Sequence, residues 1–436
     1  MEGIGLTLYL TLALLGVLQT VLMVLHTWEN RRFARRRMQE LPARRTTGRI
    51  ALFAPCKGVD LGLEANLRAL VRQDCDNYEV TFIVESADDP ACPIIHRVMR
   101  ENPHVECRLL VAGRATTTGQ KVHNLRVATA EIRPNVEYLA FVDSDARPRR
   151  EWLRTLVAHL DRPRVGAATG YRWLIPTRRT LANYLLYSMN SSVALLLGRG
   201  GRHLVWGGSW AIRKDLFESL AINACWDGTV SDDLAVSRVL HQRHLNIVFE
   251  PPCMVASPLD ETFGEMLRFH RRQYVLCRHY MPHYWAMAML GSTCSMMTWA
   301  ASLAMAVSLG LHHSPLLWLP TATCVVMYAL SVFRNRVSQS LVGVYFPALD
   351  RALRRPRQFS TWAGPMVEAI NCAGLIGTVL GRRICWRGVH YLLGRGGQIQ
   401  CLDRNLPPPQ SVFHNKTGAD SAIVPIKQNV PCRRAG

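Results

Sequence analysis

Between residues 49 and 251, short apolar runs alternate with stretches in which apolar residues recur every three or four positions. Short apolar runs bounded by turn residues are typical of buried strands, whereas the wider spacing is typical of amphipathic helices. Strands that alternate with helices predict an α/β fold with a doubly wound, mainly parallel sheet. The expected strands are residues 49–55, 78–84, 105–111, 138–142, 165–171, 205–212 and 247–251. The expected helices are residues 61–74, 94–101, 121–128, 152–160, 181–197, 234–242 and 264–280.

Three longer apolar segments, residues 5–26, 285–311 and 316–333, are each long enough to cross a bilayer. The first has no basic region before it and no small-residue cleavage site after it, so we expect an uncleaved anchor. Arginines crowd residues 31–37 directly after this anchor. Because positive charge stays on the cytoplasmic side of a span, the following domain is expected in the cytosol.

A fourth apolar segment, residues 362–380, contains Glu368 and Asn371 and has basic residues at both ends. We interpret it as re-entrant or interfacial, and its topology stays open. The predicted organisation is an anchor at 1–30, a cytosolic catalytic domain at 48–283, a membrane region with two spans at 284–402, and a disordered tail at 403–436.

The formal net charge of +20 raises the question of a nucleic-acid partner. The basic residues gather beside apolar spans, and no nucleic-acid-binding motif is present. Attraction to an anionic membrane leaflet explains the charge, so we expect a bilayer partner and no nucleic acid. The 13 cysteines include no pair with zinc-ligand spacing, and they predict no disulfide framework.

The apolar strand at 138–142 leads directly into Asp143-Ser144-Asp145. Ligands of open α/β sheets bind beyond the carboxyl ends of the strands. Two carboxylates at that position can hold a hard divalent cation, and the cation can neutralise a diphosphate. The alternative is an ordinary polar turn, because Asp and Ser are common turn residues.

Several separated patches together resemble ceramide glucosyltransferases, membrane-bound members of the large inverting glycosyltransferase family two. The resemblance covers residues 49–282 in order and spacing, and the spans match in kind. Residues 384–391 also resemble a Trp-Arg-Gly…Tyr element of bacterial relatives. The patches are residues 54–60, 78–80, 88–91, Lys121 with Asn124, 143–145, 231–233 and the Arg-rich helix near 270.

The resemblance implies a GT-A-like catalytic fold that takes a hexose, expected to be glucose, from a nucleotide sugar such as UDP-glucose. Asp145 would ligate Mg²⁺ or Mn²⁺, and Asp143 would assist the metal or contact the uridine and ribose. Lys121 would contact the diphosphate or the uridine end. Glu85 or Asp88 would supply the first acidic donor contact, and the sequence does not choose between them.

Asp232 is the expected general base, because an inverting transfer needs one carboxylate to take the acceptor hydroxyl's proton. With Asp233 it begins a helix after Ser231, where the helix dipole favours the ionised form. The alternative is that these residues only cap the helix.

The closing motif of the family corresponds to His270-Arg271-Arg272-Gln273-Tyr274, which departs from Gln/Arg-x-x-Arg-Trp at all three defining positions. Arg271 and Arg272 can still bind the donor phosphates. His270, Gln273 and Tyr274, with Asp233, are the candidate acceptor or closing residues. The alternative without a role in the site is a basic juxtamembrane helix that faces lipid phosphates.

The implied acceptor is a membrane lipid such as ceramide, with a hopanoid or diacylglycerol as alternatives. A processive polysaccharide synthase is a second possibility, although the few spans disfavour a polymer channel. A non-catalytic membrane scaffold with this fold is a third, favoured only by the altered closing motif.

Overall fold

The computed structural model describes residues 2–40 and 48–404. Its central sheet has the strand order β3-β2-β1-β4-β6-β5-β7. Every paired neighbour is parallel except at β6, which runs antiparallel to both β4 and β5. The seven strands are β1 (Arg49–Pro55), β2 (Tyr78–Val84), β3 (Glu106–Val111), β4 (Val136–Val142), β5 (Val165–Pro176), β6 (Ser209–Arg213) and β7 (Asn246–Leu259). The predicted mainly parallel α/β sheet is therefore confirmed.

Helices cover both faces of this sheet, because alternate side chains of each strand point to opposite sides. Leu52 of β1 packs in a core with α2 (Leu63–Leu70), α3 (Cys92–Glu101) and α5 (Trp152–Val157). Phe53, the next residue, packs in a second core with the helices of the other face. Those helices are α4 (Gln120–Ala130), α7 (Lys214–Ser219), α8 (Ile222–Cys225), α9 (Asp232–Gln242) and α10 (Phe263–Tyr280).

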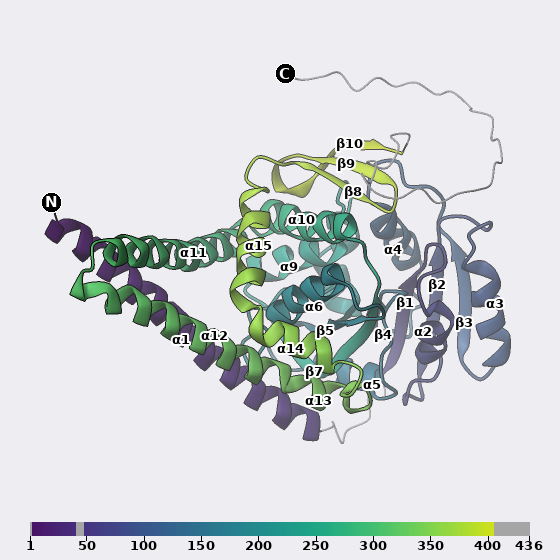
Figure 1. Cartoon of the computed structure of the whole chain (residues 1–436). Helices are drawn as coiled ribbons and strands as arrows, with labels where there is room; N and C mark the ends of the chain where they lie inside the picture. Colours follow the sequence, from purple (N-terminus) through teal and green to yellow (C-terminus); the bar gives the residue numbers. More distant parts are fainter. Residues whose placement is uncertain (1, 41–47, 405–436) are drawn as a thin grey trace, which may run out of the picture.

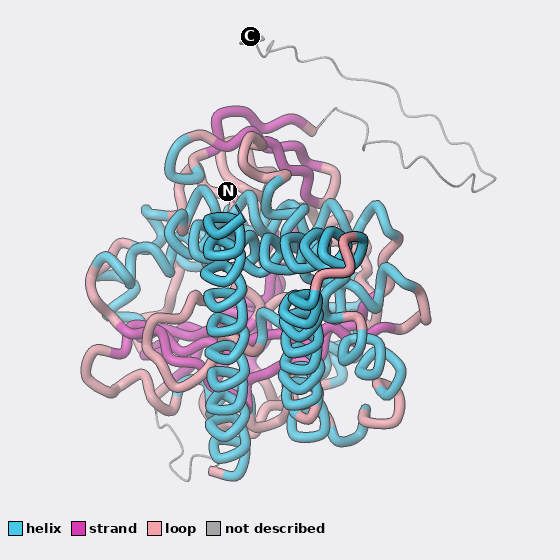
Figure 2. Tube along the Cα trace, turned by 60° about the vertical axis from the view of Figure 1, so that its left-hand side comes forward, coloured by secondary structure: helices cyan, strands magenta, loops and turns pink. Residues whose placement is uncertain are grey.

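Three long helices project from the α/β domain that contains this sheet (Figure 1). They are α1 (Glu2–Gln39), α11 (Pro282–Leu311) and α12 (Trp318–Gln339). In length and composition, the helical stretches Gly5–Gln39, Pro282–Leu311 and Pro315–Tyr345 can each cross a membrane. Polar contacts join them: the Gln19 side-chain amide donates to the Gly291 carbonyl at 2.8 Å. Figure 2 shows α1, marked by N, beside a second long helix in front of the strands.

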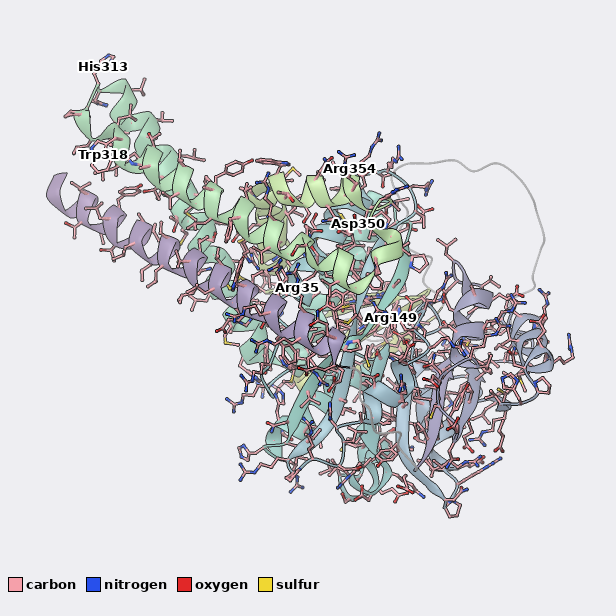
Figure 3. All side chains as sticks on the ribbon, turned by 90° about the horizontal axis from the view of Figure 1, so that it is seen from below. Arg35, Arg149, His313, Trp318, Asp350 and Arg354 are labelled. Atoms are coloured by element: carbon pink, nitrogen blue, oxygen red, sulfur yellow. The ribbon has the colours of Figure 1, made fainter. Side chains whose placement is uncertain are left out.

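The ends of these helices differ in charge. His313 and Trp318 lie at the far tip, whereas Arg35 lies beside the catalytic domain (Figure 3). The arginines of residues 31–37 continue α1 without a break, so the predicted anchor and its basic flank form one helix.

The rest of the membrane region lies between the long helices and the sheet (Figure 1). The predicted helix at 181–197 is α6, which packs against α14 and α10. With 13 residues, α15 is about 20 Å long and shorter than the ~30 Å hydrocarbon core of a bilayer. The elements of this part are α6 (Leu181–Ala194), α13 (Leu341–Tyr345), η2 (Pro347–Leu349), α14 (Arg354–Trp362) and α15 (Gly364–Ile376), whereas η1 (Pro315–Leu317) connects α11 to α12 at their far tip.

Several element boundaries differ from the sequence predictions. The strand predicted at 205–212 is only β6, because Gly207 and Gly208 lie in a turn before it. Strands β5 and β7 are longer than predicted, and they pair as far as Pro176 and Leu259. Eleven cysteines are free thiols, and Cys401 is disulfide-bonded, a bond that the sequence did not predict.

The sequence did not predict a second, three-stranded antiparallel sheet at the C-terminal end. It contains β8 (Arg383–Trp386), β9 (Val389–Leu393) and β10 (Ile399–Asp403), with η3 (Arg395–Gly397) between the last two. The predicted tail at 403–436 begins too early, since Asp403 belongs to β10 and Arg404 forms an ion pair with Glu85. The remainder of that tail lies outside the described residues.

Arg37 joins helix α1 to the α/β domain through an ion pair with Glu250. Its guanidinium lies 2.6 Å from the carboxylate of Glu250, whose side chain is only 3% exposed. Burial raises the pKa of Glu250, and Arg37 opposes that shift. We expect Arg37→Ala to destabilise the protein by about 3 kcal/mol, because it leaves a buried carboxylate without its cation.

The measurement is the melting temperature of the detergent-solubilised full chain. Arg36→Ala is the matched control, because Arg36 is exposed on the same helix turn. Adding Glu250→Gln to Arg37→Ala should recover part of the loss. Equal melting temperatures for the Arg36 and Arg37 variants would contradict the prediction.

Candidate active site

The candidate site lies at the carboxyl ends of β1, β2 and β4, where the sequence placed its acidic residues. The turn after β4 is held from two sides. The Ser144 hydroxyl donates to Asp60 Oδ2 at 3.0 Å, and the Asn66 side-chain amide donates to the Ser144 carbonyl at 3.0 Å. Asp143 and Asp145 flank Ser144, so these contacts fix both carboxylates relative to the sheet.

Lys121 of α4 connects the end of β4 to the start of α9. Its Nζ lies 2.7 Å from Asp143 Oδ1 and 3.2 Å from Asp232 Oδ1. The same Nζ donates to the Gly207 carbonyl at 3.1 Å. Burial alone would lower the pKa of Lys121, but the carboxylates of Asp143, Asp232 and Asp233 outweigh it and raise the pKa. Lys121 is therefore a charged, 15% exposed bridge rather than a solvated surface lysine.

The two aspartates at the start of α9, Asp232 and Asp233, make different contacts. Ser231 accepts the Leu234 N–H and caps the helix, and Asp233 Oδ1 accepts the same N–H at 2.8 Å. Asp233 Oδ2 also accepts the Gly207 N–H at 2.9 Å. Both carboxylate oxygens of Asp233 therefore accept backbone hydrogen bonds that stabilise the start of the helix. Asp232 takes no part in this cap.

Asp232 is the member of the pair that takes no part in the cap. Its side chain is 2% exposed, and its Oδ2 is buried without a hydrogen-bond partner in the described structure. Burial raises the pKa of Asp232 to about 7, against the opposing effect of Lys121. A carboxylate with a pKa near neutrality is suited to take a proton and to release it again.

Asp145 has the properties expected of a cation ligand. Its Oδ1 is buried and has no hydrogen-bond partner among the described residues, while the side chain as a whole is 34% exposed. Burial and the neighbouring Asp143 raise the pKa of Asp145. Arg172 stands 3.6 Å away and compensates only in part. A divalent cation would satisfy this orphaned oxygen, so the residues present fit one.

The described residues contain no group of three His, Cys, Asp or Glu side chains that could hold a metal ion. Asp143 and Asp145 would therefore supply two of the ligands of such a cation. The remaining ligands would come from substrate phosphate oxygens and water, as is usual for Mg²⁺.

The two arginines of the closing motif point in different directions. Arg272 lies between two aromatic rings, with its guanidinium carbon 5.2 Å from the ring centroid of Phe269 and 5.0 Å from that of Trp386. Burial lowers the pKa of Arg272 to about 10, and the charges of Arg172 and Arg387 contribute. Arg271 instead donates to the Arg383 carbonyl at 2.7 Å. Consecutive residues of a helix lie about 100° apart, so only one of the pair turns toward the aromatic rings.

The other closing residues contact the membrane region. His270 Nε2 and the Tyr274 hydroxyl both bond to the side-chain oxygen of Asn371 in α15. Residues four apart share a helix face, which explains why His270 and Tyr274 meet one partner. Gln273 is exposed. The structure thus brings His270 and Tyr274 against the segment whose topology the sequence left open.

Glu85 lies at the end of β2 between two cations, Lys57 at 2.9 Å and Arg404. Burial would raise the pKa of Glu85, but Lys57 and Arg404 outweigh it and lower the pKa. Asp88 is exposed, and Asp89 rather than Asp88 accepts the Gly58 N–H of the loop after β1. This geometry favours Glu85 over Asp88 as the acidic residue that lines the candidate site.

Sequence reasoning missed Arg172, Trp206 and Asp60. Arg172 stacks on Trp206, with its guanidinium carbon 5.6 Å from the ring centroid. The paired glycines Gly207-Gly208 next to Trp206 were the sequence signal that could have pointed to this part of the site. A Cβ on Gly208 would lie 2.3 Å from the Trp206 ring and 2.8 Å from Asp143 Oδ2, so glycine permits this close approach.

The family model described as Glycosyl transferase family 21 matches residues 9–399. A ceramide glucosyltransferase of Komagataella phaffii is 33% identical over 61 residues, 14% of this chain and 12% of the relative. Ceramide glucosyltransferase 1 of Caenorhabditis elegans is 24% identical over 84 residues, 19% of this chain and 18% of the relative. The chain thus matches less than a fifth of the length of either curated relative.

Two solved structures are also similar. Mannosyltransferase PcManGT from Pyrobaculum calidifontis, in complex with GDP-Man and Mn²⁺, is 15% identical with a TM-score of 0.46 over 83% of this chain and 99% of its own. GalNAc-T7 with UDP, GalNAc and Mn²⁺ is 10% identical with a TM-score of 0.37 over 53% of this chain and 49% of its own. The family match confirms the resemblance to ceramide glucosyltransferase-like membrane enzymes.

The Lys121–Asp232 contact generates a prediction about pH dependence. A base must be ionised to act, so we expect kcat/KM to fall tenfold per pH unit below about pH 7, the pKa of Asp232. Because the Lys121 charge lowers that pKa, Lys121→Met should move the acid limb upward by at least about one pH unit.

The measurement is the pH–rate profile of both proteins under donor-saturating conditions. Lys214→Met is the matched control, because Lys214 has its partners far from the carboxylates, at the Arg133 and Pro134 carbonyls. An unmoved acid limb in Lys121→Met would show that Asp232 is not the titrating base.

Proposed function

The chain belongs to Glycosyl transferase family 21, and from that premise we propose that it is an inverting transferase for a membrane lipid acceptor. The donor is a nucleotide sugar, with UDP-glucose as the first candidate, and the acceptor is a lipid such as ceramide. The single observation that carries this proposal is Asp232, a buried carboxylate with an unpartnered oxygen and a pKa near 7, placed beside the Lys121–Asp143 pair.

Asp232 acts as the general base in this proposal. The acceptor hydroxyl gives its proton to Asp232 as its oxygen forms a bond to the anomeric carbon of the sugar. The bond from that carbon to the nucleotide breaks, and the electron pair leaves with the diphosphate. Lys121 fixes the orientation of Asp232 and balances the charge between Asp143 and Asp232.

Charge on the departing diphosphate needs compensation. Asp143 and Asp145 would hold Mg²⁺ or Mn²⁺, which stabilises that charge when it is bound. Arg272 and Arg172 add guanidinium groups that suit phosphate oxygens. Arg271, predicted as a second donor contact, is occupied by the Arg383 carbonyl and is not assigned to the donor. Glu85 is assigned to the nucleoside end.

The acceptor side faces the membrane region. His270 and Tyr274 bond to Asn371 of α15, so the closing motif adjoins the apolar segment from which a lipid would enter. Exposed apolar side chains lie on α10 and α15, including Phe263, Leu267 and Met366. Such a surface suits contact with the bilayer. The proposal includes a catalytic domain on the cytoplasmic side, because positive charge such as that at 31–37 tends to stay on that side of a span.

The proposal predicts the outcome of a transfer assay. Purified full-length protein in detergent would receive Mn²⁺ or Mg²⁺, radiolabelled UDP-glucose, and a panel of ceramide, diacylglycerol and hopanoid acceptors. We expect a labelled glycolipid, and a loss of at least about 10³-fold in kcat for Asp232→Asn, because the variant has no base. Asp227→Asn is the control, since Asp227 is 64% exposed and pairs with Arg126 away from the site.

Other outcomes would select another function. A labelled water-soluble polymer would indicate a processive polysaccharide synthase. Metal-dependent binding of the nucleotide sugar without turnover would indicate a scaffold. If UDP-glucose is inert, other nucleotide sugars follow in the same assay.

Removal of divalent metal is a separate prediction. EDTA should abolish transfer, and Mg²⁺ or Mn²⁺ should restore it, because Asp145 Oδ1 has no other partner in the described structure. Asp145→Asn should weaken Mn²⁺-dependent nucleotide binding, measured by calorimetry. Full activity in EDTA would overturn the assignment of Asp143 and Asp145.

A further inference from the structure

The C-terminal sheet packs on the catalytic domain rather than on the membrane helices, above α10 in Figure 1. The Tyr280 hydroxyl donates to the Gly397 carbonyl at 2.8 Å, and Arg238 donates to the Gly396 carbonyl at 2.8 Å. Ile399 N–H also donates to the Gly228 carbonyl at 2.7 Å. These bonds hold the sheet against α9 and α10, the two helices that carry Asp232 and Arg272.

The β8–β9 turn brings two side chains of this sheet to the candidate site. Arg387 and Gly388 at the turn both have positive φ, 47° and 77°, as in the two-residue hairpin turns that suit the twist of antiparallel strands. Trp386, directly before the turn, lies against Arg272, and Arg387 reaches the loop after β1.

Arg272 depends on Trp386 for its position. The guanidinium is held between the rings of Trp386 and Phe269 and forms no ion pair with a carboxylate among the described residues. The positive charges of Arg172 and Arg387 disfavour the charged guanidinium of Arg272, and the nearby carboxylate of Glu261 offsets them only in part. The Arg272 guanidinium is thus partly buried, oriented by two aromatic rings, and close to two other arginines. Such an arrangement suits the binding of an anionic ligand.

Arg387 contacts the loop after β1, which in turn holds the acidic turn at 143–145. Its guanidinium binds both oxygens of Asp60 at 2.9 Å and donates to the Lys57 carbonyl at 2.8 Å. Asp60 in turn accepts the Ser144 hydroxyl, between Asp143 and Asp145. A chain of contacts therefore runs from the hairpin to the acidic turn.

We propose that Trp386 and Arg387 are positioning residues for the donor diphosphate. Trp386 acts through Arg272, and Arg387 acts through Asp60 on the acidic turn. The catalytic unit then includes the sheet of residues 383–404 in addition to the domain at 48–283. This inference rests on the proposed donor site, since it assigns the ligand of Arg272 to a nucleoside diphosphate.

The test is the binding of UDP in the presence of Mn²⁺ to the full chain in detergent, measured by calorimetry. Trp386→Leu keeps apolar volume but removes the π face, and it should weaken UDP binding about tenfold. Trp386→Phe keeps a ring and should bind within about threefold of the wild type. Arg387→Ala should weaken binding several-fold, whereas Arg382→Ala, an exposed arginine next to β8, should not.

A double-mutant cycle separates positioning from general packing. If Trp386 acts through Arg272, then Trp386→Leu added to Arg272→Ala should cost almost nothing further. Additive losses, or wild-type affinity in Trp386→Leu, would overturn the inference while the donor site stands. Melting temperatures of all variants within a few degrees of the wild type are expected, and a large drop shared by Trp386→Phe would indicate a packing role and also overturn it.

A wild-type chain that binds neither UDP nor GDP with Mn²⁺ would overturn the proposed function itself, and this inference with it. The two failures are thus distinguished by the wild-type titration alone.

Discussion

The ammonium group of Lys121 is the interaction on which the site depends. It lies between Asp143, at the end of a central strand, and Asp232, at the start of a helix on the same side of the sheet. Both carboxylates lie against the same ammonium group, and a shared cation offsets the repulsion between two negative charges. The β4 strand, α4 and α9 therefore have to meet at one point, and the parallel sheet supplies that meeting place.

Glycine and the cap residues make room for this arrangement. A Cβ on Gly207 would stand 2.7 Å from Lys121 Nζ, so a larger residue there would displace the bridge. Ser231 and Asp233 satisfy the first turn of α9, which frees Asp232 from capping. The pKa of Asp232 near 7 then results from burial and the charges of Asp233 and Asp143, which raise it, against Lys121, which lowers it.

The sequence predicted the half of this site that is local in the chain. The apolar strand before Asp143 and the cap before Asp232 are short-range patterns, and both can be recognised from the sequence alone. The partners of those residues come from distant segments: Asp60 follows β1, Arg172 lies in an extension of β5, and Trp386 comes from β8. The strands of the C-terminal sheet have only four or five residues each, too few for an alternation pattern to be distinguished. Long-range pairing, rather than local propensity, decides those positions.

The connection between α10 and α11 bears on how the proposed lipid acceptor and nucleotide-sugar donor would meet. Helix α10 ends at Tyr280 and α11 begins at Pro282, so the helix that carries Arg272 continues almost directly into a helix able to cross the bilayer. The Met281 N–H still bonds to the Cys277 carbonyl, which leaves little freedom at this junction. Arg272 on one face and the His270–Asn371 contact on another are therefore fixed at a set depth relative to the membrane helices. A donor bound at Arg272 would then stand at a constant height above the bilayer, and only the lipid would need to move to bring its hydroxyl to Asp232.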